Sequence, residues 1–226
     1  MQWWRVRKPA NTLPLTRYLR RIDQALSRTS ATGTVATGVH GLKRPALLSG
    51  DDLLTVIDRN RSLSAEFISW QAAHRPTDRD GITAAVIALA WLVNLGITDG
   101  GLYRAWPYDV PLVEGSAPLS GISPTQIAGG LDRLTAECLD LSNRSMVEIA
   151  RQISRVEWEI GVGPLHPFYD GCGRVSRYFS TLLCLWHNVP MPIHTSREEY
   201  MRAATSGEMT FADYWISMPH LTLAEL

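Results

Sequence analysis

Cysteine is scarce in this sequence, with three in 226 residues and no two of them close together. Cys138, Cys172 and Cys184 form no CxxC pair and the histidines are not clustered, so neither a disulfide framework nor a structural zinc site is indicated. Long apolar runs are also missing. The most apolar window, ITAAVIALAWLVNLG, has about 15 residues and stops at a glycine, which is too short to span a bilayer. No segment near the start resembles a signal peptide, so we expect a cytoplasmic protein without a membrane partner.

Net charge is absent as well, because Lys+Arg and Asp+Glu each number 22. This balance gives no global reason to expect a nucleic-acid partner. The charge is unevenly distributed, however: through Arg44 nine basic residues face Asp23 alone, a net +8 that leaves −8 for the rest. We interpret residues 1–44 as a basic N-terminal arm and residues 45–226 as the compact domain. The arm either lies on an acidic body or offers a basic surface to a phosphate-rich partner.

Helical periodicity dominates the chain. LPLTRYLRRIDQAL carries Leu15, Leu19, Ile22 and Leu26 on one face. Ser145 and Ser196 each begin a capping box that marks the start of a further helix. Only the segment YDVPLVEGSAPLSG, with its prolines and glycines, reads as a hairpin or flap. The sequence therefore predicts an all-α fold with one small β-hairpin.

The densest chemistry lies in HPFYDGCGRVSR, residues 166–177. Gly171 and Gly173 flank the expected start of a helix, where backbone N–H groups and the helix dipole favour an anion. Arg174 and Arg177 lie three positions apart on one helix face, and their guanidinium groups suit phosphate oxygens. This stretch therefore predicts a phosphate-binding loop.

Two further residues of the same stretch suggest a reaction. Asp170 is an odd neighbour for an anion unless a divalent cation lies between them, and Mg²⁺ typically takes one or two carboxylates plus substrate phosphates. His166 lies where it could accept a proton from an attacking hydroxyl. Loop, metal ligand, base and arginines together indicate phosphoryl or nucleotidyl transfer.

The stretch resembles the signature of the Fic family, His-Pro-Phe-x-Asp/Glu-Gly-Asn-Gly-Arg-x-x-Arg, at every specified position except one. GLYR, residues 101–104, is similar to the Gly-x-Tyr-Arg that often precedes the flap of that family. The resemblance covers roughly residues 81–211 and implies a Fic-like helical bundle with a flap. It leaves the N-terminal arm uncovered.

The resemblance implies a nucleotidyltransferase that moves AMP, or another NMP, from Mg-bound ATP or another NTP to a hydroxyl of a protein or small molecule. It implies His166 as base, Asp170 as Mg²⁺ ligand, and Arg174 and Arg177 as ligands of the outer phosphates. Gly171, Cys172 and Gly173 would cradle the phosphates through their backbone N–H groups. The flap residues implied to hold the acceptor are Leu112, Val113, Glu114 and Gly115.

Cys172 is the departure, because the family usually has asparagine there. A thiol is a poor donor, so we expect an altered donor preference or a slower reaction. A second interpretation makes Cys172 a nucleophile, because a helix N-terminus and nearby arginines would lower its pKa.

An inhibitory segment of the family, Ser/Thr-x-x-x-Glu-Gly/Asn, has only a weak match in SLSAEF, where Glu66 would pair with Arg177. Inhibition by a separate partner protein and assembly into a homo-oligomer are further alternatives. Three alternative functions are phosphotransfer, modification of a small molecule, and a catalytically silent Fic-fold binding module. Gly173 argues against phosphotransfer, because the phosphotransferring Doc branch has lysine at this position.

Overall fold

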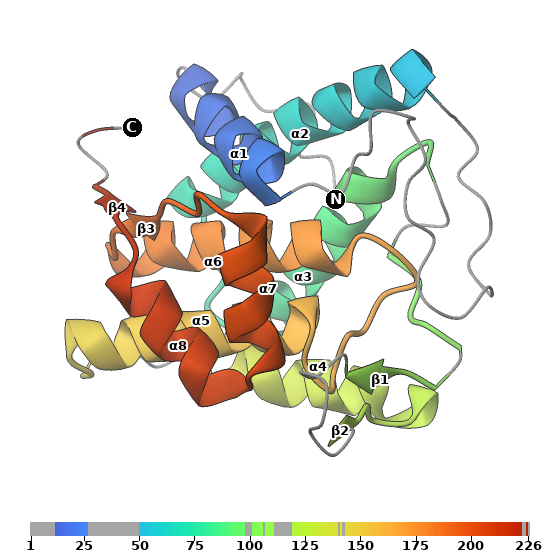
Figure 1. Cartoon of the computed structure of the whole chain (residues 1–226), viewed down its shortest axis with the longest axis vertical. Helices are drawn as coiled ribbons and strands as arrows, with labels where there is room; N and C mark the ends of the chain where they lie inside the picture. Colours follow the sequence, from blue (N-terminus) through green and yellow to red (C-terminus); the bar gives the residue numbers. More distant parts are fainter. Residues whose placement is uncertain are drawn as a thin grey trace.

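The computed structural model describes residues 12–26, 50–97, 101–105, 107–110, 119–139, 141, 143–222 and 225. This part of the chain contains eight α-helices, one 3₁₀ turn and two short antiparallel strand pairs, which confirms the predicted all-α class (Figure 1). The helices are α1 (Leu13–Leu26), α2 (Gly50–Ala73), α3 (Arg79–Asn94), α4 (Ile127–Ala136), α5 (Met146–Gly161), α6 (Cys172–His187), α7 (Arg197–Thr205) and α8 (Glu208–Ser217).

Local signals in the sequence fix several helix starts. Ser145 caps α5 by accepting a hydrogen bond from the Glu148 N–H. The Glu148 carboxylate in turn accepts from the Ser145 N–H, as the capping box predicts. Ser196 accepts from the Glu199 N–H at the start of α7. Helix α1 has the bounds that its apolar stripe predicts.

The pair α5 and α6 forms the centre of the bundle, and the loop between them is the HPFYDGCGRVSR loop (Figure 1). Val175, Phe179 and Leu182 of α6 are fully buried, at the three- and four-residue spacing of one helix face. Ile153 and Val156 of α5 are equally buried. The ends of these two packed helices therefore give the loop a rigid base.

The predicted hairpin is present at its base. Strands β1 (Asp109–Val110) and β2 (Leu119–Ser120) pair antiparallel, with Asp109 opposite Ser120. Residues 111–118 lie outside the described part of the chain. A second pair, which the sequence analysis did not predict, joins β3 (Met191–Pro192) to β4 (His220–Leu221) and closes the C-terminal end.

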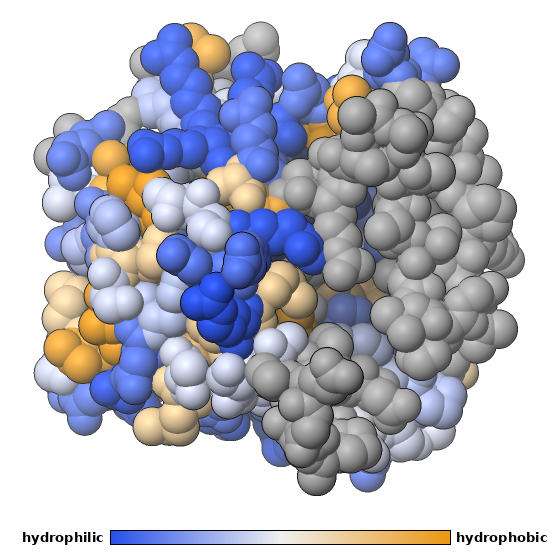
Figure 2. Space-filling view, viewed as in Figure 1, coloured by the Kyte–Doolittle hydropathy of each residue, from blue (hydrophilic) through white to orange (hydrophobic). Residues whose placement is uncertain are grey.

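Helix α1 packs on α2 and α7 although it belongs to the segment interpreted as an arm. Leu15, Leu19 and Ile22 are buried in the same apolar core as the central helices. Its outer face is hydrophilic (Figure 2) and includes the exposed Arg17, Arg20 and Arg21. The division at residue 44 stays a prediction, but α1 is docked on the body of the protein.

A buried carboxylate ties the C-terminal helices to the central pair. Glu157 of α5 is fully buried and accepts hydrogen bonds from Ser180 (2.7 Å), Tyr200 (3.1 Å) and Trp215 (3.1 Å). Nε2 of buried His194 lies 3.6 Å from its Oε1. Such a network rigidifies a core only while all its members are satisfied.

Among the helices of the described residues, none combines the length and the apolar character that crossing a membrane requires.

The buried histidine predicts an acid-sensitive fold. Burial lowers the pKa of His194 from 6.5 to about 4. Between these values the unfolded chain takes up a proton that the folded chain does not, so the free energy of unfolding falls as the pH drops from 6.5 to 4. The contribution of His194 is up to ~3 kcal/mol.

Urea unfolding followed by circular dichroism across this pH range tests the prediction. We expect His194→Gln to lose less stability on acidification than the wild type. His74 is exposed, so His74→Gln serves as the control. We expect it to keep the wild-type slope of unfolding free energy against pH. Equal slopes for His194→Gln and the wild type would contradict the expectation.

Candidate active site

The loop from Val162 to Gly171, which contains His166, joins the C-terminus of α5 to the N-terminus of α6. Gly171 is the N-cap of α6 and has a φ of 74°, in the left-handed region that glycine adopts readily. Space is equally restrictive there, since a Cβ on Gly171 would lie 2.8 Å from Oδ1 of Asn94 on α3. The first N–H groups of α6 lack intrahelical acceptors and offer a place for an anion.

His166 is held in an unusual backbone conformation, with a φ of 26°. Its N–H donates to the Glu159 carbonyl at 3.0 Å, and its Nδ1 lies 3.0 Å from the Gly161 carbonyl oxygen. A carbonyl can only accept, so Nδ1 carries the proton in this contact. Nε2 of the neutral ring therefore keeps its lone pair, which is what a general base requires.

Arg104, which lies outside the loop in the sequence, holds the loop through hydrogen bonds. This buried side chain donates from Nε to the His166 carbonyl at 2.9 Å and from Nη2 to the Ile122 carbonyl at 2.7 Å. Its own N–H donates to the Pro167 carbonyl at 2.9 Å. Arg104 therefore connects the loop to the segment that follows the flap, a role that sequence reasoning did not assign.

Tyr108 lies against the imidazole. The rings of Tyr108 and His166 stack with their centroids 4.0 Å apart and their planes 4° apart. Burial raises the pKa of the Tyr108 hydroxyl, which therefore stays protonated at neutral pH and donates to the Val162 carbonyl at 3.3 Å. The sequence analysis placed Tyr108 in the hairpin segment and missed this contact.

Asp170 lies directly before the N-cap, half-buried. Its Oδ1 accepts from the Gly171 N–H at 2.6 Å, and its carbonyl accepts from Nδ2 of Asn94 at 3.0 Å. No group of three His, Cys, Asp or Glu side chains that could hold a metal is found among the described residues.

Cys172 occupies the first position of α6 with 3% of its surface exposed. Its thiol donates to the Phe168 carbonyl at 3.4 Å, and its Sγ accepts from the Phe168 N–H at 3.3 Å. The side chain therefore braces the inside of the loop. A thiol buried in this way is poorly placed to act as a nucleophile, and the phosphate-cradle interpretation, which uses only the backbone, stays a prediction.

Comparison with solved structures finds the same architecture in Fic proteins. A Fic-domain-containing signalling protein from Bacteroides thetaiotaomicron matches with a TM-score of 0.55 and 18% identity, over 77% of this chain and 71% of its own. The N-terminal Fic domain of a VirB-translocated Bep effector from Bartonella quintana matches with 0.52 and 17%, over 91% and 96%. The chain has the Fic fold.

A Fic family protein from Desulfovibrio desulfuricans agrees, with a TM-score of 0.54 and 19% identity over 90% of this chain and 63% of its own. No protein-family model and no curated protein matches the sequence. At these identities the solved structures show the Fic fold alone, and the roles of the signature residues stay predictions.

The two arginines of the Fic-type signature have different surroundings. Arg174, half-buried in the first turn of α6, lies with Nη1 3.4 Å from the Val93 carbonyl at the end of α3. Arg177 is buried, and a Cβ on Gly173 would lie 3.3 Å from its Nη1. Both guanidinium groups thus lie near the start of α6, but Arg177 is the more enclosed.

Arg177 already has an anionic partner. Its Nη2 lies 3.4 Å from Oδ1 of Asp23 on α1, and the same carboxylate accepts from Arg61 at 2.9 Å and from the Tyr178 hydroxyl at 2.6 Å. Within the described residues the ion pair of Arg177 is with Asp23 and not with Glu66. The inhibitory role suggested for Glu66, which is half-buried on α2, stays a prediction.

The flap residues of the Fic-type site lie outside the described part of the chain, so their role also stays a prediction. They are Leu112, Val113, Glu114 and Gly115.

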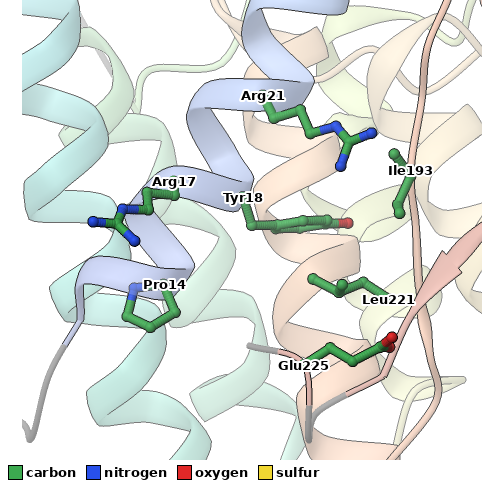
Figure 3. A pocket seen from close by; sticks show the side chains of 7 residues that line it. All are labelled: Pro14, Arg17, Tyr18, Arg21, Ile193, Leu221 and Glu225. Carbon is green, nitrogen blue, oxygen red and sulfur yellow. The ribbon is translucent and has the colours of Figure 1, made fainter.

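A groove of about 260 Å³ lies elsewhere, between α1 and the C-terminal strands (Figure 3). Its lining residues are Pro14, Arg17, Tyr18, Arg21, Ile193, Leu221 and Glu225. In Figure 3 Arg21 extends toward Ile193, whereas Arg17 points away from it. None of these residues belongs to the α5–α6 loop.

The close packing of Gly171 predicts a large effect of adding one methyl group. Gly96 is a matched control because it has the same φ of 74°, while its nearest neighbour to an added Cβ is 3.4 Å away. We expect Gly96→Ala to lower the free energy of unfolding by roughly 1 kcal/mol through backbone strain alone. Gly171→Ala should cost about 1–3 kcal/mol more, because Asn94 and the loop must shift.

Urea denaturation of the two variants measures this difference. Equal losses of stability would show that the loop accommodates a side chain at Gly171 and is less constrained than the geometry indicates.

Proposed function

We propose that the chain is a nucleotidyltransferase that moves AMP, or another nucleoside monophosphate, from a Mg–NTP to a hydroxyl acceptor. The observation that carries the proposal is the hydrogen bond from His166 Nδ1 to the Gly161 carbonyl, which leaves Nε2 as a proton acceptor. This base lies in the loop that ends at the N-terminus of α6. A base and an anion site on one short loop suit phosphoryl-group chemistry.

In this proposal the acceptor hydroxyl gives its proton to Nε2 of His166. Its oxygen forms a bond to the α-phosphorus while the bond from that phosphorus to the bridging oxygen breaks, so pyrophosphate leaves. The N–H groups at Gly171, Cys172 and Gly173 would bind phosphate oxygens, and Arg174 and Arg177 would offset their charge. Asp170 would hold Mg²⁺, which when bound neutralises phosphate charge.

The acceptor would lie along the flap beside β1, as a protein segment or a small molecule with a free hydroxyl. We infer a cytoplasmic location, because nucleoside triphosphates are abundant there and no disulfide joins Cys138, Cys172 or Cys184.

A second candidate is a silent Fic-fold binding module. The contact between Arg177 and Asp23 favours it, because an arginine already paired with a buried carboxylate is less available to a phosphate. Displacing such a partner costs the energy of leaving one buried charge unpaired.

Labelled nucleotides separate these functions. Purified protein with Mg²⁺ and cell lysate is incubated with ATP, GTP, CTP or UTP labelled at the α- or the γ-phosphate, and protein and small-molecule fractions are analysed. We expect transfer of α-label only, reduced about 10²- to 10⁴-fold in His166→Ala, because a general base contributes that much. His74→Ala, at an exposed histidine, is the control and retains the activity.

Transfer of γ-label alone would establish phosphotransfer instead. Nucleotide binding without transfer of either label would favour the silent module. Equal α-labelling by His166→Ala and the wild type would contradict the role of His166.

A further inference from the structure

The last carbonyl of α5 and the carbonyl of its C-cap accept hydrogen bonds from two side chains that lie far apart in the sequence. The Gly161 carbonyl accepts from His166 Nδ1 at 3.0 Å, and the next carbonyl, that of Val162, accepts from the Tyr108 hydroxyl at 3.3 Å. Carbonyls at a helix end have no intrahelical partner and need such donors. The imidazole and the phenol are thereby attached side by side to one rigid helix end.

The ring stack with Tyr108 restricts the motion that one hydrogen bond still permits to the imidazole of His166. The hydrogen bond at Nδ1 by itself permits an imidazole to tilt about that contact, which moves Nε2. The Tyr108 ring, parallel to the imidazole within 4° and 4.0 Å from it, covers one face and blocks tilting toward that side. The backbone of His166 is held as well, because its N–H donates to the Glu159 carbonyl at 3.0 Å and its carbonyl accepts from Arg104 at 2.9 Å.

Tyr108 is itself fixed at the base of the hairpin. Its carbonyl accepts from the Gly121 N–H at 2.7 Å, and the Arg104 guanidinium carbon lies 5.7 Å from its ring centroid. The next residue, Asp109, begins β1 opposite Ser120. A Cβ on Gly121 would lie 2.2 Å from the Tyr108 carbonyl oxygen, so the two segments approach closely only because residue 121 is glycine.

We propose that Tyr108 is a positioning residue for His166, which holds the imidazole in one orientation and couples that orientation to the base of the β1–β2 hairpin. The catalytic meaning of this coupling rests on the function proposed above. A shift of the hairpin would move the Tyr108 backbone and, through the stack, the ring of the base. An acceptor bound along the hairpin would thus be matched to the direction of Nε2.

The hydroxyl and the ring of Tyr108 contribute separately, which allows a sharp test. Tyr108→Phe keeps the stack and loses the hydrogen bond to Val162, whereas Tyr108→Leu and Tyr108→Met lose the aromatic face. Long-range ¹H–¹⁵N spectra of the histidine side chains report which ring nitrogen carries the proton, without any need for activity. The His166 signals are assigned by their absence in His166→Gln, and those of exposed His74 are the internal control.

We expect the wild type and Tyr108→Phe to show His166 protonated at Nδ1. Tyr108→Leu and Tyr108→Met should show an averaged tautomer at His166 and unchanged His74 signals. In the labelling assay the two aliphatic variants should lose about tenfold to a hundredfold in kcat, with the KM for the nucleotide unchanged, because only the base is misplaced. Tyr108→Phe should stay within about threefold of the wild type, because the stack is kept.

Unchanged His166 signals in folded Tyr108→Leu or Tyr108→Met would overturn the proposal. Altered signals in a protein that transfers no label would uphold the positioning of His166 while refuting the transferase function, so the two failures are distinguishable. Circular dichroism identifies variants that keep the fold, and two aliphatic replacements guard against the loss of one.

Discussion

The geometry of the candidate site depends on the buried guanidinium of Arg104. It donates to the carbonyls of His166 and Ile122, and so joins the loop between α5 and α6 to the segment after the hairpin. An arginine can do this because its donors form a rigid planar fork and it stays charged when buried. Without it, the strained backbone at His166, with its φ of 26°, would lose one of the contacts that maintain it.

Around this contact the site is built from parts that each limit one motion. The end of α5 orients the imidazole, Gly171 lets the chain turn into α6, and Asn94 holds the Asp170 carbonyl from α3. The Oδ1 of Asn94 is buried without a hydrogen-bond partner among the described residues. Such an atom is costly in a folded protein, which marks the contact between α3 and the loop as a place where ligand binding could rearrange hydrogen bonds.

Charge connects the site to the N-terminal helix. Asp23 is the only acidic residue before Pro45, so the charge count of the sequence shows it as a single acidic residue in a basic arm. In the structure it is buried between Arg61, Arg177 and Tyr178. The surface arginines of α1 therefore do not indicate the role of this helix. Its one carboxylate, that of Asp23, contacts Arg177 of the signature motif.

Local rules explain what the sequence predicted well. The bounds of α1, the capping boxes at Ser145 and Ser196 and the helix start next to Gly171 depend on residues a few positions apart. The pairs Asp23–Arg177 and Tyr108–His166, and the β3–β4 pairing, join residues far apart in the chain. No periodicity or spacing encodes such contacts, because they arise only when several helices have packed.

Binding of a nucleoside triphosphate at the N-terminus of α6, as proposed, is tested most directly by calorimetric titration of the full chain with Mg²⁺ and a non-cleavable ATP analogue. We predict one site that requires Mg²⁺ and is weakened at least about tenfold in Arg174→Ala, since a charge-assisted hydrogen bond contributes roughly 1.5–3 kcal/mol. Arg202→Ala on α7, a control at an exposed arginine paired with Glu198, should bind as the wild type does. Absence of binding, or equal affinity in Arg174→Ala, would contradict the account.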